Sequence, residues 1–352
     1  MNENVIYEKL WADSVLPIGV GVEKSFHIGY NKETEKKFSL LSFRKEEQKM
    51  SFDRLCDKIL EMKNPTVAGL DPTLKYIPEE IRAACREQFS DPFEAAAESF
   101  FLFNKGLIDA LCDIVPAVKP QAAYYEALGW QGVRAMERTV AYAAQKGMFV
   151  ILDGKRNDIG STMEAYSNAY LGMTDLEGEK RAAFGADALT ANGYLGRDGI
   201  APLLEACREY DKGIFVLVKT SNPSSGQLQD RLMDGDPLYL QMGRLCEEWG
   251  SEAPGSKYGY SSVGAVVGAT YPQMLAELRQ ALPHTFFLVP GYGAQGGGAE
   301  GVRPAFDGDG LGAIVNSSRA IMTAWQKQGR PGSEFAAAAR DEALRMRADL
   351  VG

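Results

Sequence analysis

The strongest chemical signal in the sequence is a group of charged residues that follows a buried-type apolar run. Asp153, Lys155 and Asp158 come directly after Phe, Val, Ile and Leu at 149–152. Residues two apart on an extended strand face the same side, about 6–7 Å apart, so Asp153 and Lys155 are expected to point together. Lys119 ends another apolar run and adds a second ammonium group. Two carboxylates and two ammonium groups are neutral overall, and all four are expected to stay ionised. Such a set favours protonation of a carbanion by Lys155 and disfavours a neutral lysine that forms a Schiff base.

A glycine-rich segment is the second signal. Residues 290–298 read Pro-Gly-Tyr-Gly-Ala-Gln-Gly-Gly-Gly and follow an apolar run. Glycines expose backbone N–H groups and let an oxyanion approach closely. In α/β barrels, phosphates often bind to the loops after the last two strands, and Arg319 follows the final apolar run as a bidentate cation. The segment predicts a phosphate-binding loop that can act as a lid, with a flexible connector as the structural alternative.

Short apolar runs are the elements that must position these groups. From residue 66 onward they alternate with longer stretches in which apolar residues recur every three or four positions. The runs are rich in Val, Ile, Leu, Phe and Ala and do not alternate strictly, as expected of parallel strands buried on both faces. The predicted strands are 66–70, 117–119, 148–152, 186–190, 214–219, 263–269, 286–289 and 313–316.

The stretches between these runs carry helix signals. Residues 93–114 follow Ser-Asp-Pro, which is a good cap with proline in the first turn, and the apolar residues of 132–146 share one helical face. Eight β/α units in about 285 residues favour a closed (β/α)8 TIM barrel. An open doubly wound sheet is the alternative, but it usually has a glycine fingerprint after its first strand, which residues 69–72 do not supply.

Polar residues follow five of the predicted strands, at the end where a barrel keeps its active site. One such group alone is readily explained as a solvated loop, whereas five at the same relative position predict a shared site. The five are Asp71, Lys119, 153–158, 219–223 and 316–319.

Composition excludes several classes of protein. The chain has 352 residues, a net charge of −9, 45% hydrophobic and 24% charged residues, which is a soluble globular balance. The acidic charge argues against a nucleic-acid polymer or an anionic membrane as partner, and no apolar run approaches the ~20 residues of a membrane span. The first 30 residues lack the pattern of a signal peptide. Five widely spaced cysteines without a CxxC pair favour the cytoplasm, and two histidines, His27 and His284, exclude a multi-histidine metal site.

Residues 1–49 stand outside the β/α rhythm. Residues 23–48 are rich in charges of both signs, which is typical of a hairpin or helix packed on a barrel or of a loose segment. We therefore expect an N-terminal extension, 1–49, that the chemistry does not need, and a barrel domain, 50–352. Met50 is an alternative start of the chain.

Four motifs occur in order on the predicted strands. They are Lys119-Pro120-Gln121, Asp153-Gly-Lys155-Arg-Asn-Asp158-Ile159-Gly160-Ser161-Thr162, Thr220-Ser221-Asn222-Pro223 and Pro290-Gly-Tyr-Gly-Ala-Gln295-Gly296-Gly. Together they resemble the orotidine 5′-phosphate decarboxylase family, in particular its longer bacterial subgroup, from about Met50 to the end of the chain. The resemblance implies conversion of orotidine 5′-phosphate to uridine 5′-phosphate, the last step of de novo pyrimidine nucleotide synthesis, without a metal or an organic cofactor.

The resemblance also implies a role for each site residue. Lys155 would protonate C6 of the pyrimidine, Asp153 would lie beside the departing carboxylate, and Lys119 would bridge the ribose and the charged network. Asp158 and Thr162 would reach into the neighbouring subunit's site in a homodimer. The implied substrate contacts are Asp71 to a ribose hydroxyl, Ser221 to the pyrimidine, Gln295 and Arg319 to the phosphate, and Pro223 and Gly296 beside them.

Two alternatives stay open. A magnesium-dependent sugar-phosphate decarboxylase or aldolase on the same barrel would share the Asp-x-Lys-x-x-Asp element, but it would carry a carboxylate where Lys119 stands. A non-catalytic phosphate-binding barrel is the other alternative, and the intact set of lysines and aspartates disfavours it.

Overall fold

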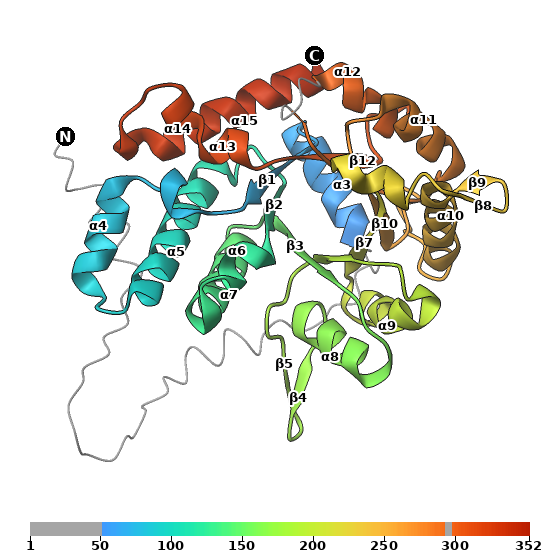
Figure 1. Cartoon of the computed structure of the whole chain (residues 1–352), viewed down its shortest axis with the longest axis horizontal. Helices are drawn as coiled ribbons and strands as arrows, with labels where there is room; N and C mark the ends of the chain where they lie inside the picture. Colours follow the sequence, from blue (N-terminus) through green and yellow to red (C-terminus); the bar gives the residue numbers. More distant parts are fainter. Residues whose placement is uncertain (1–50, 293–297) are drawn as a thin grey trace. The chain divides into compact units, whose positions relative to one another are not determined.

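The computed structural model describes residues 51–292 and 298–352. Eight of its strands pair in parallel and close into a barrel (Figure 1). Each strand pairs with its neighbours in chain order, and the last pairs with the first. The predicted TIM barrel is thereby confirmed, and the open sheet is excluded. The barrel strands are β1 (Thr66–Leu70), β2 (Ala117–Pro120), β3 (Phe149–Arg156), β6 (Ala188–Ala191), β7 (Gly213–Lys219), β10 (Val263–Val267), β11 (Phe287–Pro290) and β12 (Ala313–Ser317).

Burial explains why these strands could be recognised in the sequence. Every residue of β1, β2, β6, β10 and β12 is buried, so their apolar character is continuous rather than alternating. Strand β3 departs furthest from its predicted bounds, because the predicted strand ends at residue 152 whereas β3 continues to Arg156. Its register against β6 shifts between Leu152 and Arg156, and Lys155 has a left-handed φ of 48°. The prediction of a regular extended strand here is wrong, since the strand bulges at its functional end.

Helices follow the strands and surround the barrel (Figure 1). Most of them bury one face against the strands and expose the other, as the three- and four-residue spacing predicts, whereas one helix is buried on all sides over residues 95–108. The helices are α3 (Ser51–Met62), α4 (Glu79–Gln88), α5 (Pro92–Leu111), α6 (Ala122–Glu126), α7 (Gly129–Gln145), α8 (Gly160–Tyr170), α9 (Ala201–Tyr210), α10 (Leu238–Gly250), α11 (Pro272–Ala281), α12 (Ala299–Val302), α13 (Arg319–Met322), α14 (Ala324–Lys327) and α15 (Phe335–Val351).

Two helices predicted from the sequence are present with shifted ends. The carboxylate of Asp91 accepts a backbone hydrogen bond from the first turn of α5 at 3.1 Å, which is the expected cap. Helix α5 ends at Leu111 rather than at residue 114, and α7 begins at Gly129 rather than at residue 132. Within the described residues, every helix is too short or too polar to cross a membrane.

Helix α3 closes the amino-terminal mouth of the barrel. Its apolar face packs into a buried cluster formed by the first residues of the strands. The Phe52 ring lies 4.9 Å from that of Phe215 and 5.4 Å from that of Phe286, between centroids. Gly264 leaves the room that this aromatic group needs, since a Cβ there would lie 2.6 Å from Phe215. With this end sealed, a ligand has to enter at the carboxyl ends of the strands.

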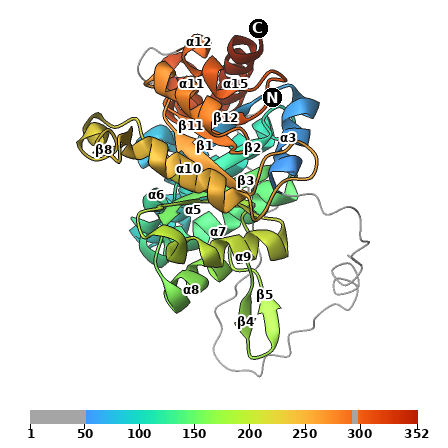
Figure 2. The same ribbon diagram turned by 90° about the vertical axis from the view of Figure 1, so that its right-hand side faces the viewer.

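Two small hairpins interrupt the β/α rhythm, and the sequence analysis did not predict them. Strands β4 (Thr174–Leu176) and β5 (Glu179–Arg181) follow α8, and β8 (Leu232–Met233) and β9 (Asp236–Pro237) lie between β7 and α10. Both hairpins project from the barrel (Figure 2). Strands of two or three exposed residues carry too little pattern to be recognised. The predicted extension, 1–49, and Met50 lie outside the described residues.

Candidate active site

Two lysines share one carboxylate at the carboxyl end of the barrel. Lys119 Nζ, near the end of β2, lies 2.6 Å from Asp153 Oδ2 on β3. Lys155 Nζ lies 2.7 Å from Asp153 Oδ1. The side chains of Lys119 and Asp153 are buried, whereas that of Lys155 is 45% exposed. The ammonium group of Lys155 is therefore the one that a ligand can reach, and Asp153 holds it in place.

The charges of this cluster keep its buried members ionised. Burial alone raises the pKa of Asp153, but the ammonium groups of Lys119 and Lys155 outweigh it and hold that pKa well below its ordinary value. Burial alone lowers the pKa of Lys119, but the charges of Asp153 and Asp71 outweigh it and raise that pKa above its ordinary value. Asp153 therefore stays a carboxylate and Lys119 an ammonium ion at neutral pH, as the sequence analysis expects.

The bulge of β3 is tied to the neighbouring strand β6 by one hydroxyl group. The backbone N–H of Lys155 donates to Thr190 Oγ1 at 2.9 Å, and this hydroxyl donates to Asp153 Oδ1 at 2.8 Å. On the other side, Arg156 donates to the carbonyl of Gly154 at 2.8 Å. Sequence reasoning did not identify Thr190. The available signal was that it is the single polar residue of the buried strand β6.

Among the described residues, Asp158 and Thr162 make no hydrogen bond or ion pair with this cluster. Asp158 accepts a hydrogen bond from the backbone N–H of Ile159 at 2.8 Å and, among the described residues, forms no ion pair. Thr162 is exposed in the first turn of α8. Within one chain, the four-charge set expected from the sequence therefore lacks Asp158.

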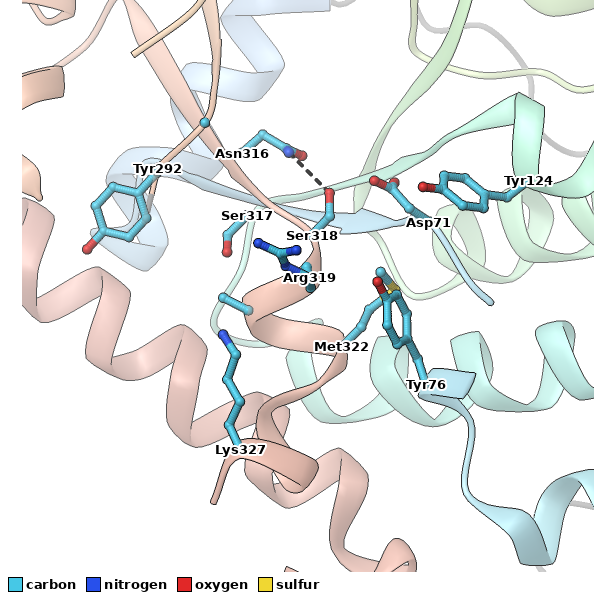
Figure 3. Close-up of a pocket in the computed structure, with 12 residues that line it drawn as sticks. Asp71, Tyr76, Tyr124, Tyr292, Asn316, Ser317, Ser318, Arg319, Met322 and Lys327 are labelled. Atoms are coloured by element: carbon cyan, nitrogen blue, oxygen red, sulfur yellow. Dashed lines mark hydrogen bonds between the residues drawn. The ribbon is translucent and has the colours of Figure 1, made fainter. Parts of the chain in front are cut away.

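A cavity of about 320 Å³ opens beside the cluster, between the ends of β1 and β12 and the start of the loop after β11 (Figure 3). Asp71, Tyr292, Arg319 and Lys327 are among its lining residues. Neither Arg319 nor Lys327 forms an ion pair with any side chain that the structure describes, so both cations are available to an anion. Lys327 was not predicted from the sequence, because no motif surrounds it.

Two residues that line the same cavity each carry a buried acceptor atom. Asp71 Oδ1 and Asn316 Oδ1 have no hydrogen-bond partner in the described part of the chain. Figure 3 shows the two side chains turned toward one another, with the amide of Asn316 donating to Ser318 Oγ at 3.2 Å. Ser318 packs so closely on Gly69 of β1 that a Cβ there would lie 1.8 Å from Ser318 Oγ. Buried acceptors without donors suit the hydroxyl groups of a ligand.

The loops after β7, β10 and β11 meet around Ser221. A Cβ on Gly268 would lie 3.0 Å from the Cβ of Ser221, and one on Gly291 would lie 3.9 Å from it. Pro223 begins a short 3-10 helix, η3 (Pro223–Gln227), and is exposed. The structure thus places Ser221 beside the start of the glycine-rich loop. Gln295 and Gly296, the predicted phosphate contacts of that loop, lie outside the described residues.

The start of the glycine-rich loop is anchored to the last helix. Tyr292 is buried, and its hydroxyl donates to the carboxylate of Asp349 on α15. Burial, together with this carboxylate, raises the pKa of Tyr292 to about 12, so the hydroxyl stays protonated as a donor. The loop therefore leaves β11 from a fixed point beside the cavity.

Taken together, these groups offer an exposed ammonium as a proton donor, a buried carboxylate beside it, and two cations at an adjoining cavity. No group of three His, Cys, Asp or Glu side chains in residues 51–292 and 298–352 is placed to hold a metal ion. The arrangement can stabilise negative charge near Lys155 and bind an anionic group several ångströms away.

Comparison with known proteins gives a consistent result. Residues 104–329 match the family described as "Orotidine 5′-phosphate decarboxylase / HUMPS family". Orotidine 5′-phosphate decarboxylase of Rhodopirellula baltica is 47% identical over 281 residues, covering 80% of this chain and 89% of that protein. The enzyme of the same name from Clostridium tetani is 40% identical over 86% of this chain and 98% of its own. The solved structure of Leishmania donovani OMP decarboxylase aligns with a TM-score of 0.63 at 29% identity, covering 85% and 99% of the two chains.

Proposed function

The chain belongs to the orotidine 5′-phosphate decarboxylase / HUMPS family, and we propose that it is a carbon–carbon lyase that converts orotidine 5′-phosphate to uridine 5′-phosphate and carbon dioxide. This reaction is the last step of de novo pyrimidine nucleotide synthesis. The observation that carries the proposal is the placement of Lys119 and Lys155 on the single carboxylate of Asp153, beside a cavity lined by the cations of Arg319 and Lys327, which form no ion pair with any described residue.

The chemical step needs a stabilised carbanion and a proton. When the bond between C6 and the carboxylate breaks, carbon dioxide leaves and the electron pair stays on C6. The ammonium group of Lys155 stabilises this developing charge and then donates a proton from Nζ to C6. Because the Lys155 side chain is 45% exposed, solvent can return the proton to its amine after product release.

The rest of the nucleotide supplies binding energy that positions C6. Arg319, Lys327 and the glycine-rich loop with Gln295 hold the phosphate, and Ser221 hydrogen-bonds the pyrimidine. The carboxylate of Asp71, which lines the cavity, accepts from a ribose hydroxyl. Binding energy from such remote contacts holds the reacting carbon against the charged cluster, where orientation lowers the barrier.

Lys119 distinguishes this proposal from a magnesium-dependent sugar-phosphate enzyme of the same barrel. It puts an ammonium group, paired to Asp153 at 2.6 Å, where that alternative requires a carboxylate. Full turnover in the presence of a metal chelator is the expected result. Loss of turnover on chelation, restored by magnesium, would contradict the proposal.

The decisive experiment is turnover of orotidine 5′-phosphate by the wild type and by Lys155→Ala. We expect the variant to lose at least about 10³-fold in kcat, since both charge stabilisation and the proton are removed. Lys180→Ala, on the exposed strand β5, is the matched control and should keep wild-type kcat. An inactive wild type would overturn the assigned reaction, and a fully active Lys155→Ala would overturn the mechanism.

We further propose that the enzyme is a homodimer in which Asp158 and Thr162 complete the partner's site. Their lack of contacts with the Asp153 cluster among the described residues supports this, as does the exposed apolar side chain of Ile159 between them in the chain. Mixing Lys155→Ala with Asp158→Ala should restore one functional site per heterodimer, because both defects then fall in the other site. Isolated heterodimers without activity would refute the shared site.

Two further proposals concern the compartment in which the enzyme works and the role of residues 1–49. We propose that the enzyme works in the cytoplasm, which the five unpaired cysteines support. We also propose that residues 50–352 carry the reaction and that 1–49 are dispensable for it. A chain that begins at Met50 should keep wild-type kcat. A truncated chain that folds but is inactive would show otherwise.

A further inference from the structure

The bulge of β3 places Lys155 in a backbone conformation that its residue type disfavours. Its φ of 48° is left-handed, where a Cβ crowds the following carbonyl group. Such a conformation persists only where the surrounding structure fixes it, and it often occurs at active sites. Two neighbours make hydrogen bonds to this bulge, Thr190 on β6 and Arg156 on β3 itself.

The hydroxyl group of Thr190 has one possible orientation. Thr190 is 1% exposed, and its Oγ1 accepts from the backbone N–H of Lys155 at 2.9 Å. The single proton of that hydroxyl is then free to point at Asp153 Oδ1, 2.8 Å away, which is a carboxylate and can only accept. The same carboxylate oxygen also accepts from Lys155 Nζ at 2.7 Å. One hydroxyl therefore joins the backbone of Lys155 to the carboxylate that holds its ammonium group.

We propose that Thr190 is a positioning residue for proton delivery by Lys155. It fixes the left-handed backbone of Lys155 and the rotamer of Asp153 together, so that the ammonium group stays in line with the reacting carbon. This inference rests on the proposed decarboxylation. Thr190 does not line the cavity that takes the phosphate, so its effect falls on the chemical step rather than on substrate binding.

Arg156 provides a different support for the bulge. It donates to the carbonyl of Gly154 at 2.8 Å and to the hydroxyl of Tyr170 on α8 at 3.1 Å, and it pairs with Glu126 on α6. These contacts hold the bulge from the helix side but reach neither Asp153 nor the N–H of Lys155. Without the Thr190 hydroxyl, the bulge keeps the support of Arg156. The hydroxyl bridge between the backbone of Lys155 and the carboxylate of Asp153 is lost.

Thr190→Val tests the proposal, because valine keeps the shape of threonine and removes both hydrogen bonds. We expect kcat to fall by about tenfold to hundredfold, as small misplacements of a reacting group do. The KM for orotidine 5′-phosphate and the Kd for uridine 5′-phosphate should change by less than about threefold. Thr190→Ser restores the hydroxyl and should recover kcat to within about threefold of the wild type.

Thr139→Val is the matched control. Thr139 is a fully buried threonine on α7 whose hydroxyl donates to the carbonyl of Ala135 at 2.8 Å and accepts from the amide of Asn104 at 3.4 Å, so it also makes two buried hydrogen bonds but none to Asp153 or Lys155. We expect Thr139→Val and Thr190→Val to lower Tm alike, whereas Thr139→Val should leave kcat unchanged. Unchanged kcat in Thr190→Val, or an equal loss in Thr190→Ser, would overturn the positioning role. A wild type that does not turn over orotidine 5′-phosphate would overturn the proposed function and this inference with it, and that failure is visible before any variant is compared.

Discussion

Lys119 and Lys219 look alike at first sight and differ in what surrounds them. Each is a buried lysine at the carboxyl end of a barrel strand, on β2 and β7 respectively, and each pairs with one aspartate. Lys119 Nζ lies 2.6 Å from Asp153, and Lys219 Nζ lies 2.5 Å from Asp230. By type, position and partner, both satisfy the same description of a candidate catalytic lysine.

The two lysines differ in the burial and the further contacts of the aspartates with which they pair. The Asp153 side chain is 9% exposed and is shared with Lys155 and Thr190, whereas that of Asp230 is 41% exposed. Asp230 belongs to the insertion between β7 and α10, so Lys219 ties that insertion to the barrel.

The remaining contacts of Lys219 also indicate that it anchors the insertion to the barrel. Its ammonium group donates to Ser225 Oγ at 3.2 Å and lies over the rings of Tyr239 and Tyr271, 5.7 Å and 5.2 Å from their centroids. Burial of a paired lysine is therefore no mark of catalysis by itself. What distinguishes the site is a buried carboxylate shared between one buried cation and one cation that is open to a ligand.

The largest effect expected from this difference is on kcat. Lys119→Met leaves the buried carboxylate of Asp153 with Lys155 as its remaining cation. The ammonium group of Lys155 is then drawn toward Asp153 and loses its alignment with the reacting carbon. We expect kcat to fall by about 10²- to 10³-fold. Lys219→Met leaves Asp230 in contact with solvent, and its kcat should stay within about threefold of the wild type. Steady-state kinetics on the two variants measure both kcat values. Equal losses of kcat would mean that Lys119 and Lys219 have the same role.

The second expected effect is on stability at acid pH. The pKa of Asp153 is held well below its ordinary value of about 3.9, so the folded state gains stability from the carboxylate above that pH and loses it as pH falls further. The difference in unfolding free energy between the wild type and Asp153→Asn should be constant above about pH 5. Below about pH 4 it should narrow by up to about 1.4 kcal/mol per pH unit.

Urea unfolding between pH 2 and pH 6 measures this narrowing. Asp230→Asn, at the half-exposed carboxylate, is the comparison, and its difference from the wild type should be small throughout. A difference for Asp153→Asn that stays constant down to pH 2 would mean that the two lysines do not hold its charge.

The strands of the barrel could be predicted because their pattern depends on burial alone. β1 was predicted at residues 66–70 and occurs there, since both its faces are covered and every position is apolar or small. Helix ends were less accurate. The end of α5 at Leu111 depends on how the chain turns into β2, and local periodicity contains no information on that turn.

The residue types of the site could also be predicted, but its geometry could not. Asp153 and Lys155 were recognised by their spacing, yet they meet across a bulge and not on the regular strand that the spacing suggested. Thr190 was missed because its role arises from the pairing of β3 with β6, and a lone polar residue in a buried strand does not show which group it will contact. Asn316 was expected beside Asp71 because both lie at the ends of predicted strands, whereas Lys327 reaches the cavity through the packing of a segment far from any strand end, which no spacing in the sequence encodes.

The smallest effect in this comparison is expected on KM, and it concerns the insertion that Lys219 anchors. Ser221, the proposed pyrimidine contact, and Pro223 follow Lys219 by two and four residues, so loss of the anchor should loosen them. Gln229 still holds the segment, since it accepts from the N–H of Thr220 at 3.0 Å and donates to its hydroxyl at 2.9 Å. We therefore expect Lys219→Met to raise KM by about two- to fivefold, and Lys219→Met with Gln229→Leu to raise it further. If the double variant has the KM of the wild type, the insertion does not bind substrate, and Lys219 stabilises the fold alone.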